Sequence, residues 1–348
     1  MLVEPRFLAT AIGSLPHTDT GAACRLMLEN LTGMPPWPQL PMRSFLENMY
    51  AQYSEGLPGI RVDESARRVW FQSDEMTADE LEEFYRAVID EDLDSFAVSE
   101  RYAAGLAGFL GGEFDEELEG RPFIKGQVTG PVTFGLTVTD QEGRATRYDG
   151  TLEQGIVKGL NLKARWQSRE LKRAAPEADV VLFFDEPYLV SVGSALVGVT
   201  REQVIRDIKE CIAGCGADVT GIHCCGNTDW SILFEVGVDI VSFDAFDCLE
   251  GFTAYHREIE AHISRGGVIA WGIVPDSEKA IGLSAGGLAD ILEGAFDTLE
   301  GRGIDREMLA RQSIVTPACG LGPTSVEAAE AALSLTGELS NLLKMRYF

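Results

Sequence analysis

The sequence contains no apolar run long enough to cross a membrane. Its hydrophobic stretches all fall short of the roughly 18 consecutive residues that a bilayer-spanning helix needs. The first residues, MLVEPRFLATAIGSLPH, lack the basic start, the continuous apolar segment and the small-residue cleavage site of an export signal. We therefore expect a cytoplasmic protein that has no membrane partner.

Basic residues are scarce relative to acidic ones. The chain has 29 Lys and Arg against 55 Asp and Glu, which gives a formal net charge of -26. A charge of this size repels phosphate backbones and anionic lipids across a Debye length. We therefore expect no nucleic-acid partner, and we attribute the acidity to solubility or to a salty habitat before any specific cationic partner.

The remaining composition is that of an ordinary globular protein without obvious subdivisions. Hydrophobic residues make up 45% and charged residues 24% of the 348 positions, and internal repeats, low-complexity tracts and flexible linkers are absent. Seven cysteines, an odd number in a chain without an export signal, predict reduced thiols rather than a disulfide framework. We expect one domain over residues 1–348.

Short apolar runs that stop at turn residues alternate with amphipathic segments along most of the chain. This alternation predicts an α/β protein whose parallel strands close into a TIM (β/α)8 barrel. The expected strands lie at 7–12, 94–98, 121–128, 178–184, 218–227 (ending in a loop), 238–243, 267–273 and 312–315. The expected helices lie at 77–88, 151–175, 201–215, 228–236, 251–264, 288–299 and 325–343.

One stretch after the first strand does not follow the alternation. Residues 33–75 hold four closely spaced prolines, then the turn sequence Gly56-Leu57-Pro58-Gly59, and then the β-prone run Arg68-Val69-Trp70-Phe71. We interpret this stretch as an irregular, Pro-rich insertion that contains a small hairpin.

A pair of metal-binding residue types stands at the end of the fifth strand. His223 and Cys225 are two positions apart, so on a strand their side chains share a face while Cys224 points away. The active site of a TIM barrel lies at the carboxyl ends of its strands, where Cys319 follows the eighth strand and Asp244 follows the sixth. An imidazole, two thiolates and a carboxylate form a suitable zinc site.

Other cysteines and histidines have simpler interpretations. Cys248 lies just past the sixth strand and is an alternative to Asp244 as the fourth ligand, as is an open coordination position. Three cysteines are interpreted as inert buried side chains, namely Cys24, Cys211 and Cys215. Three histidines are interpreted as solvated turn or helix residues, namely His17, His256 and His262.

Five short segments, all at predicted strand ends or their loops, occur in a distinctive order. They are Ile12-Gly13-Ser14-Leu15-Pro16, the run KGQVTGPVT at 125–133, Asp185-Glu186-Pro187, His223-x-Cys225 and Pro317-x-Cys319-Gly320-Leu321. Together they resemble the C-terminal catalytic barrel of cobalamin-independent methionine synthase, and the resemblance spans nearly the whole chain. They also resemble, in decreasing degree, the methylcobalamin:coenzyme M methyltransferases and uroporphyrinogen decarboxylase.

The resemblance implies a zinc-dependent methyltransferase that converts homocysteine to methionine. His223, Cys225 and Cys319 would be the zinc ligands. The family's fourth ligand is a glutamate on the sixth strand, and the corresponding residue here is Asp244, which is one methylene shorter. The fourth ligand is therefore open between Asp244, Cys248 and an exchangeable position.

The resemblance also assigns residues to the amino-acid substrate. Asp185 would hold the amino group of homocysteine, and Glu100 would assist it. Ile12, Gly13 and Ser14 would contact the rest of the amino acid.

The choice of methyl donor depends on how each leaving group departs. Zinc deprotonates a coordinated thiol and so creates the nucleophile. The tertiary amine of methyltetrahydrofolate leaves only when a general acid protonates it, whereas cobalt(I) leaves a methyl-corrinoid without one. The full-length methionine synthases carry an additional N-terminal barrel that helps to bind folate, and this sequence has none. We therefore expect methylcobalamin or a methylated corrinoid protein as donor, with methyltetrahydrofolate second.

Three alternatives remain open from the sequence. The acceptor could be coenzyme M or another thiol, although carboxylates at Asp185 and Glu100 suit an ammonium group and would repel a sulfonate. A metal-free decarboxylase of uroporphyrinogen would need arginines for its substrate carboxylates, and the strand ends have almost none. A non-catalytic zinc or corrinoid-binding module would have four permanent protein ligands.

Overall fold

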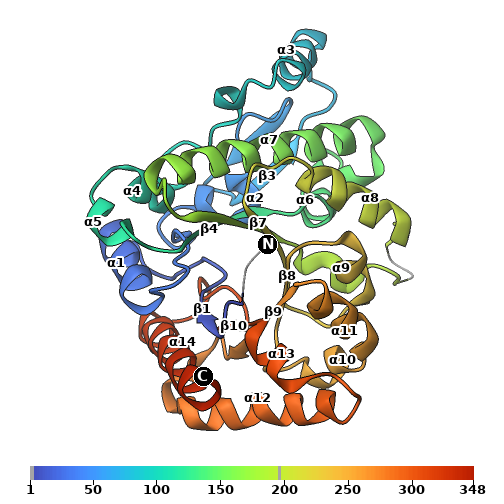
Figure 1. Cartoon of the computed structure of the whole chain (residues 1–348). Helices are drawn as coiled ribbons and strands as arrows, with labels where there is room; N and C mark the ends of the chain where they lie inside the picture. Colours follow the sequence, from blue (N-terminus) through green and yellow to red (C-terminus); the bar gives the residue numbers. More distant parts are fainter. Residues whose placement is uncertain (1–3, 195–196) are drawn as a thin grey trace.

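The computed structural model describes residues 4–194 and 197–348, and its centre is a curled parallel sheet (Figure 1). Seven strands pair in the order β1-β10-β9-β8-β7-β6-β4, and every neighbouring pair is parallel. The strands are β1 (Leu8–Ala9), β4 (Phe123–Thr129), β6 (Asp179–Asp185), β7 (Val219–Cys224), β8 (Ile240–Phe243), β9 (Val268–Val274) and β10 (Ser313–Pro317).

The Pro-rich segment fills the eighth place in the ring, between β1 and β4. Trp37 donates its backbone N–H to the carbonyl of Lys125 at 3.3 Å, and Gln39 donates its N–H to the carbonyl of Gly13 at 3.0 Å. These contacts form single parallel pairings on both sides and close the TIM barrel. Pro36 and Pro38 cannot donate, so the segment pairs at isolated points rather than along a continuous ladder.

The strand predicted at residues 94–98 is wrong. The chain forms the 3-10 helix η2 (Leu93–Phe96) there instead. Asp94 and Ser95 are exposed, and the Ser95 hydroxyl donates to the Asp92 carboxylate at 2.7 Å. These polar side chains stabilise a turn, whereas a barrel strand would be buried on both faces.

Helices surround the ring and follow the strands in sequence (Figure 1). The longest is α7, which contacts β4 and β6 and lies beside α8. Besides α3 (Ala78–Ile89), which follows the insertion, the α-helices outside the insertion are α1 (Thr20–Asn30), α4 (Ala104–Leu110), α5 (Asp115–Leu118), α6 (Pro131–Thr137), α7 (Gly150–Ala174), α8 (Arg201–Ile212), α9 (Ser231–Val236), α10 (Leu249–Thr253), α11 (His256–Ser264), α12 (Ala285–Glu300), α13 (Arg306–Arg311) and α14 (Val326–Tyr347). No helix of the described residues is long and apolar enough to cross a membrane.

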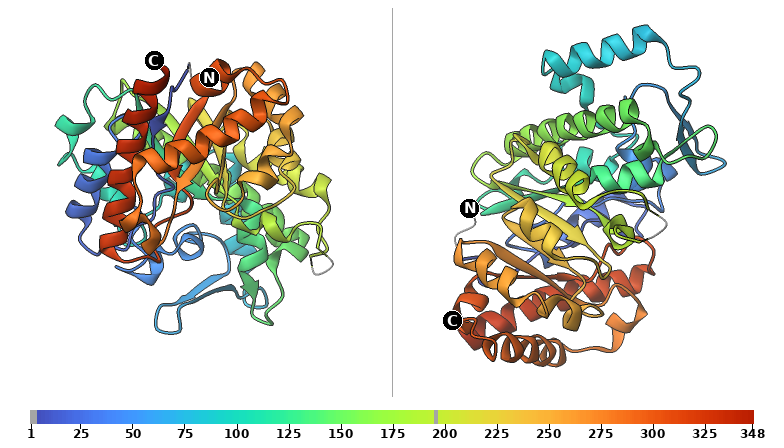
Figure 2. Two further views of the ribbon diagram at one scale, coloured as in Figure 1. Left: turned by 90° about the horizontal axis from the view of Figure 1, so that it is seen from below. Right: turned by 90° about the vertical axis from the view of Figure 1, so that its right-hand side faces the viewer.

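The rest of the insertion forms two short helices and a β-hairpin beside the barrel. It contains η1 (Phe45–Glu47), α2 (Met49–Gln52) and the hairpin of β2 (Ile60–Asp63) and β3 (Arg68–Phe71), which confirms the predicted hairpin. Strand β3 also pairs with β5 (Thr139–Asp140), so the hairpin is tied to the loop after α6. Helix α3 (Ala78–Ile89) follows and projects away from the ring in Figure 1 and in the right-hand view of Figure 2.

Two apolar clusters position the functional end of the barrel. The larger lies between the strands and the surrounding helices. The smaller takes alternate residues from the strands and forms a plug within the ring, consisting of Met34, Val181, Phe183, Val219, Ile240, Val268, Ala270 and Ile314. Side chains beyond this plug, at the carboxyl ends of the strands, form the candidate site.

Candidate metal and substrate site

Three predicted ligands meet at the mouth of the barrel. One ligand atom each from His223, Cys225 and Cys319 lies within 4.8 Å of the other two. His223 is on β7, Cys225 follows that strand directly, and Cys319 follows β10. The barrel therefore brings together, from strands about 90 residues apart, a donor set that suits zinc.

The imidazole of His223 is oriented by the neighbouring strand. Its Nδ1 lies 3.0 Å from the hydroxyl of Ser242, the residue paired with His223 in the β7–β8 register. Its Nε2 is buried and has no hydrogen-bond partner among the described residues. A buried ring nitrogen without a partner, beside two sulfur atoms, fits a metal ligand held by a second hydrogen bond.

The two thiols form an asymmetric pair. The thiol of Cys319, and after it the imidazole of His223, hold the pKa of Cys225 well below its usual range. The same contact with Cys225, together with burial, raises the pKa of Cys319. One sulfur is therefore disposed to be a thiolate before any metal binds, which favours cation binding at this place.

The ligands open into a cavity of about 380 Å³, which is large enough for a small amino acid. Asp185, at the end of β6, lines this cavity and is only 7% exposed. Its Oδ1 has no hydrogen-bond partner among the described residues. Burial raises the pKa of Asp185 to about 6, against the opposing effects of His223 and Lys125. The Oδ1 atom is therefore free to accept a hydrogen bond from a group bound in the cavity.

A second carboxylate that the sequence did not predict also lines the cavity. Glu47 of η1 is 1% exposed, and its Oε1 accepts a hydrogen bond from Arg43 at 2.8 Å. Its Oε2 is buried without a partner, and burial raises its pKa. Glu47 was missed because it lies in irregular backbone, although it is the only acidic residue between Asn30 and Glu55 in this acid-rich chain.

The Ile12-Gly13-Ser14 segment lies at the cavity wall. Ile12 and Ser14 line the cavity, and the Ser14 hydroxyl accepts the backbone N–H of Gly322 at 3.2 Å. Gly13 has φ +143°, and a Cβ there would lie 2.8 Å from the side chain of Gln127. A residue larger than glycine would therefore displace the segment.

The buried Lys125 contacts the backbone of this segment. The ammonium of Lys125 donates to the carbonyl of Ile12 at 2.8 Å and lies 4.4 Å from the centre of the Phe183 ring. Complete burial lowers the pKa of Lys125 to about 8, and the charge of Asp185 opposes this shift. Lys125 thus links the Ile12-Gly13-Ser14 segment to the charge of Asp185.

Two predicted site residues lie elsewhere. Asp244 is not among the residues whose ligand atoms lie within 4.8 Å of one another, and its Oδ1 accepts the backbone N–H groups of Phe246 and Asp247, both at 2.9 Å. Burial raises the pKa of Asp244. Glu100 is exposed in the turn after η2 and does not line the cavity, since the strand that would have positioned it is absent.

Cys248 and Asp276 are two further half-buried residues that could contribute to the site. Cys248 is half-buried and is also outside the three-ligand group. Asp276, after β9, is half-buried, and its pKa is raised mainly by burial and in part by the charge of Cys225. Asp276 is therefore a further carboxylate near the thiols, and it was not among the predicted site residues.

The three cysteines interpreted as inert and two of the other histidines are buried. Cys24, Cys211 and Cys215 are buried, as predicted. The solvated interpretation is wrong for His262, which is 0% exposed, and for His17, which is 9% exposed. His262 lies on the inner face of α11, where Nε2 lies 3.1 Å from the carbonyl of Val268.

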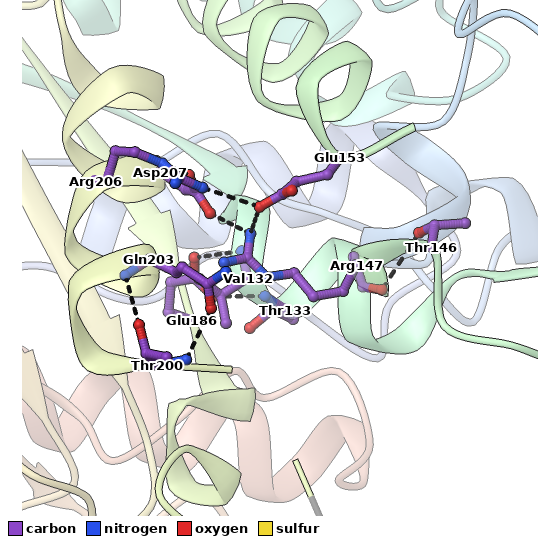
Figure 3. A network of polar contacts seen from close by, with 11 residues as sticks. Val132, Thr133, Thr146, Arg147, Glu153, Glu186, Thr200, Gln203, Arg206 and Asp207 are labelled. Atoms are coloured by element: carbon purple, nitrogen blue, oxygen red, sulfur yellow. Dashed lines mark hydrogen bonds and ion pairs between the residues drawn. The ribbon is translucent and has the colours of Figure 1, made fainter. Parts of the chain in front are cut away.

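A network of polar contacts holds the start of α6, the helix that follows β4 (Figure 3). Glu186 is adjacent to Asp185 but points to the opposite side, where it accepts the backbone N–H groups of Val132 at 3.0 Å and Thr133 at 2.7 Å. Burial raises the pKa of Glu186 to about 7. The carboxylate binds the amino-terminal turn of α6 and thereby couples the ends of β4 and β6.

Arg147 is the centre of the same network (Figure 3). Its side chain is 3% exposed and contacts the carboxylates of Asp207 and of Glu153, the latter at 2.9 Å. Arg206 approaches both acids from the solvent side, at 2.8 Å from Asp207 and 3.2 Å from Glu153. These four residues, named here the Arg147 network, join η3 (Thr146–Tyr148), α7 and α8.

Comparison with known proteins adds evidence on the fold. No protein-family model matches the sequence, and no curated protein is detectably similar to it. Among solved structures, the chain is similar to a B12-independent methionine synthase from Shewanella sp. W3-18-1, solved in complex with selenomethionine. The sequence identity is 15%, the TM-score is 0.59, and the match covers 99% of each chain. The chain therefore has the TIM-barrel fold that this methionine synthase also has.

Proposed function

We propose that the protein is a zinc-dependent S-methyltransferase that methylates homocysteine to methionine. The observation that carries the proposal is the juxtaposition, in one cavity, of the His223, Cys225 and Cys319 group with two buried carboxylates. A cation-binding donor set suits a thiol, and the carboxylates suit an ammonium group on the same small molecule.

Asp185 and Glu47 would bind the amino group of the acceptor. Each has one buried carboxylate oxygen without a hydrogen-bond partner among the described residues. A buried acceptor without a partner costs roughly 1–3 kcal/mol, and an ammonium donor would remove that cost. The structurally similar methionine synthase was solved in complex with an amino acid, selenomethionine.

His223, Cys225 and Cys319 would hold the zinc ion. Bound zinc would deprotonate the acceptor thiol and fix its sulfur near the methyl donor. Ser242 would keep Nε2 of His223 directed at the ion through its 3.0 Å contact with Nδ1. In the reaction the acceptor sulfur forms a bond to the methyl carbon while the donor's bond to that carbon breaks and the donor keeps the bonding electrons.

We favour a methyl-corrinoid as the donor, free or bound to a corrinoid protein. The ionisable residues that line the cavity are the three ligands, the two carboxylates and Arg67. With the carboxylates bound to the acceptor's ammonium, no further acid lines the cavity in the described part of the chain to protonate the amine of methyltetrahydrofolate. Methyltetrahydrofolate is the second candidate, because the structurally similar enzyme is described as B12-independent.

The other acceptors and reactions fit the cavity less well. The sulfonate of coenzyme M would face Asp185 and Glu47, both negatively charged when ionised. A uroporphyrinogen decarboxylase would need several arginines, and Arg67 is the only Lys or Arg among the described residues that line the cavity.

Zinc-loaded protein with homocysteine, offered methylcobalamin and methyltetrahydrofolate in separate reactions, tests the proposal. We expect methionine from methylcobalamin and loss of that activity in Cys319→Ser. Methionine from methyltetrahydrofolate alone would refute the donor assignment. If neither donor yields methionine, or if Cys319→Ser keeps full activity, the proposed function is refuted.

A further inference from the structure

An arginine at the tip of the insertion hairpin reaches the mouth of the barrel. Arg67 is the last residue of the turn between β2 and β3, and it lines the same cavity as Asp185 and the three candidate metal ligands. The hairpin belongs to the insertion rather than to the barrel, so it adds a group that the strand ends do not supply.

Arg67 has no acidic partner within the described residues, although it is exposed and the chain has a net charge of -26. The nearby Arg61 lies 3.8 Å from Glu75, and Arg101 lies 2.5 Å from Glu64. The guanidinium of Arg67 lies instead 5.4 Å from the centre of the Phe45 ring. Its hydrogen-bonding edge therefore stays available for an anion.

The backbone presents Arg67 in a defined position. The Asp63 carboxylate accepts the N–H of Ala66 at 2.9 Å and so fixes the turn. Arg67 itself has φ +50°, in the left-handed region that residues other than glycine rarely adopt. The Phe45 ring beneath it belongs to η1, the same short helix that carries Glu47 into the cavity.

We propose that Arg67 recognises an anionic group on the methyl donor. This inference rests on the proposed function, in which the acceptor binds to the buried carboxylates Asp185 and Glu47. Arg67 is exposed at the rim, on the side from which a second substrate must enter. Guanidinium groups bind phosphate and carboxylate groups through paired hydrogen bonds, so the anion is the phosphodiester of a cobalamin or the glutamate of a folate.

Binding of unreactive corrinoids separates this role from turnover. Cyanocobalamin carries the nucleotide phosphodiester, and dicyanocobinamide lacks it. We expect zinc-loaded protein to bind cyanocobalamin about tenfold more tightly than dicyanocobinamide in a calorimetric titration. Arg67→Ala should abolish this preference and Arg67→Lys should retain part of it. Arg68→Ala is the matched control, because Arg68 stacks on Trp70 at 4.8 Å and does not line the cavity.

A second titration covers the other donor. If wild-type protein binds methyltetrahydrofolate rather than corrinoids, Arg67→Ala should weaken that binding about tenfold, and Arg68→Ala should not. Homocysteine binding should be equal in wild-type protein and in both variants. The proposal is overturned if Arg67→Ala leaves the binding of whichever donor is used unchanged, an outcome that leaves the proposed methyl transfer intact. Absence of methyl transfer from every donor would overturn the proposed function as well.

Discussion

Asp185 and Glu47 make the substrate assignment testable at the level of single atoms. Asp185→Asn and Glu47→Gln keep the shape of each side chain and remove its charge. Because each carboxylate would pair with the ammonium of homocysteine, we expect each variant to bind homocysteine about 10-fold more weakly, which corresponds to about 1.4 kcal/mol. Calorimetric titration of zinc-loaded protein measures this directly.

The matched ligand for that experiment is propane-1-thiol, which lacks both the amino and the carboxyl group. Its binding should be the same in wild-type protein, Asp185→Asn and Glu47→Gln. Equal loss of affinity for homocysteine and for the plain thiol would mean that the substitutions disturb the metal site and do not report on the ammonium group.

His262 predicts how stability depends on pH. Its ring is 0% exposed, and burial lowers its pKa to about 4 from the ordinary value of 6.5. The unfolded chain takes up a proton below pH 6.5 whereas the folded protein resists it until about pH 4. Stability should therefore fall by about 3 kcal/mol, through this residue, as the pH drops across that window.

Urea unfolding of wild-type protein and His262→Gln at pH 7.5 and pH 4 checks this contribution. The variant should be less stable at pH 7.5 but should lose about 3 kcal/mol less than wild-type protein between the two values. His256→Gln, at a partly buried position at the start of α11, is the comparison variant that removes a histidine from the same helix. An unchanged pH dependence in His262→Gln would contradict the account.

The sequence identified single residues best where their chemistry is rare. His223, Cys225 and Cys319 could be predicted because histidine and cysteine together at strand ends have few other uses. Glu47 could not, because it lies in the irregular insertion and follows no predicted strand. Asp276 follows the seventh predicted strand, but acidic residues are too common in this chain for one of them to indicate a site. The solvated interpretation of His262 failed because an isolated histidine at helical spacing does not show which face of the helix is buried.

The helices behind the cavity depend on the buried Arg147 network. Arg147→Met leaves Asp207, which is 0% exposed, without its inner cation. Removing one partner of a buried ion pair typically costs about 3–5 kcal/mol, so we expect a loss of that size in urea unfolding. Arg206→Met provides the comparison, because Arg206 contacts the same acids but is 52% exposed and should cost about 1 kcal/mol or less. Equal losses would contradict the network's arrangement.

The barrel strands were predictable and their closure was not. Continuous apolar runs such as Val180–Phe184 and Val268–Val274 belong to strands buried on both faces, and they gave seven of the eight positions. The eighth position is occupied by a segment with prolines at 35, 36 and 38, which has none of the residue preferences of a strand. The N–H groups of Trp37 and Gln39, which lie between prolines, donate to β4 and to the segment after β1, and the carbonyls of Pro35 and Gln39 accept in return.

At the scale of the whole molecule, the barrel and its insertion contribute different parts of the proposed reaction. The strand ends supply the ligand group and Asp185, whereas the insertion supplies Glu47 and Arg67. The acidic residues on the surface take no part in the proposed reaction. The two carboxylates that do, Asp185 and Glu47, are buried in the cavity. The fold is shared with a methionine synthase, and the reaction proposed for this chain depends on the ligand group.

Zinc X-ray absorption, recorded before and after the addition of homocysteine, tests that dependence most directly. His223, Cys225 and Cys319 predict two sulfur ligands and at least one nitrogen ligand on the resting ion. If homocysteine sulfur binds the ion, the number of sulfur ligands should rise from two to three, and the rise should be absent with methionine. A zinc site whose sulfur count does not change with homocysteine would be structural and would contradict the proposed methyl transfer.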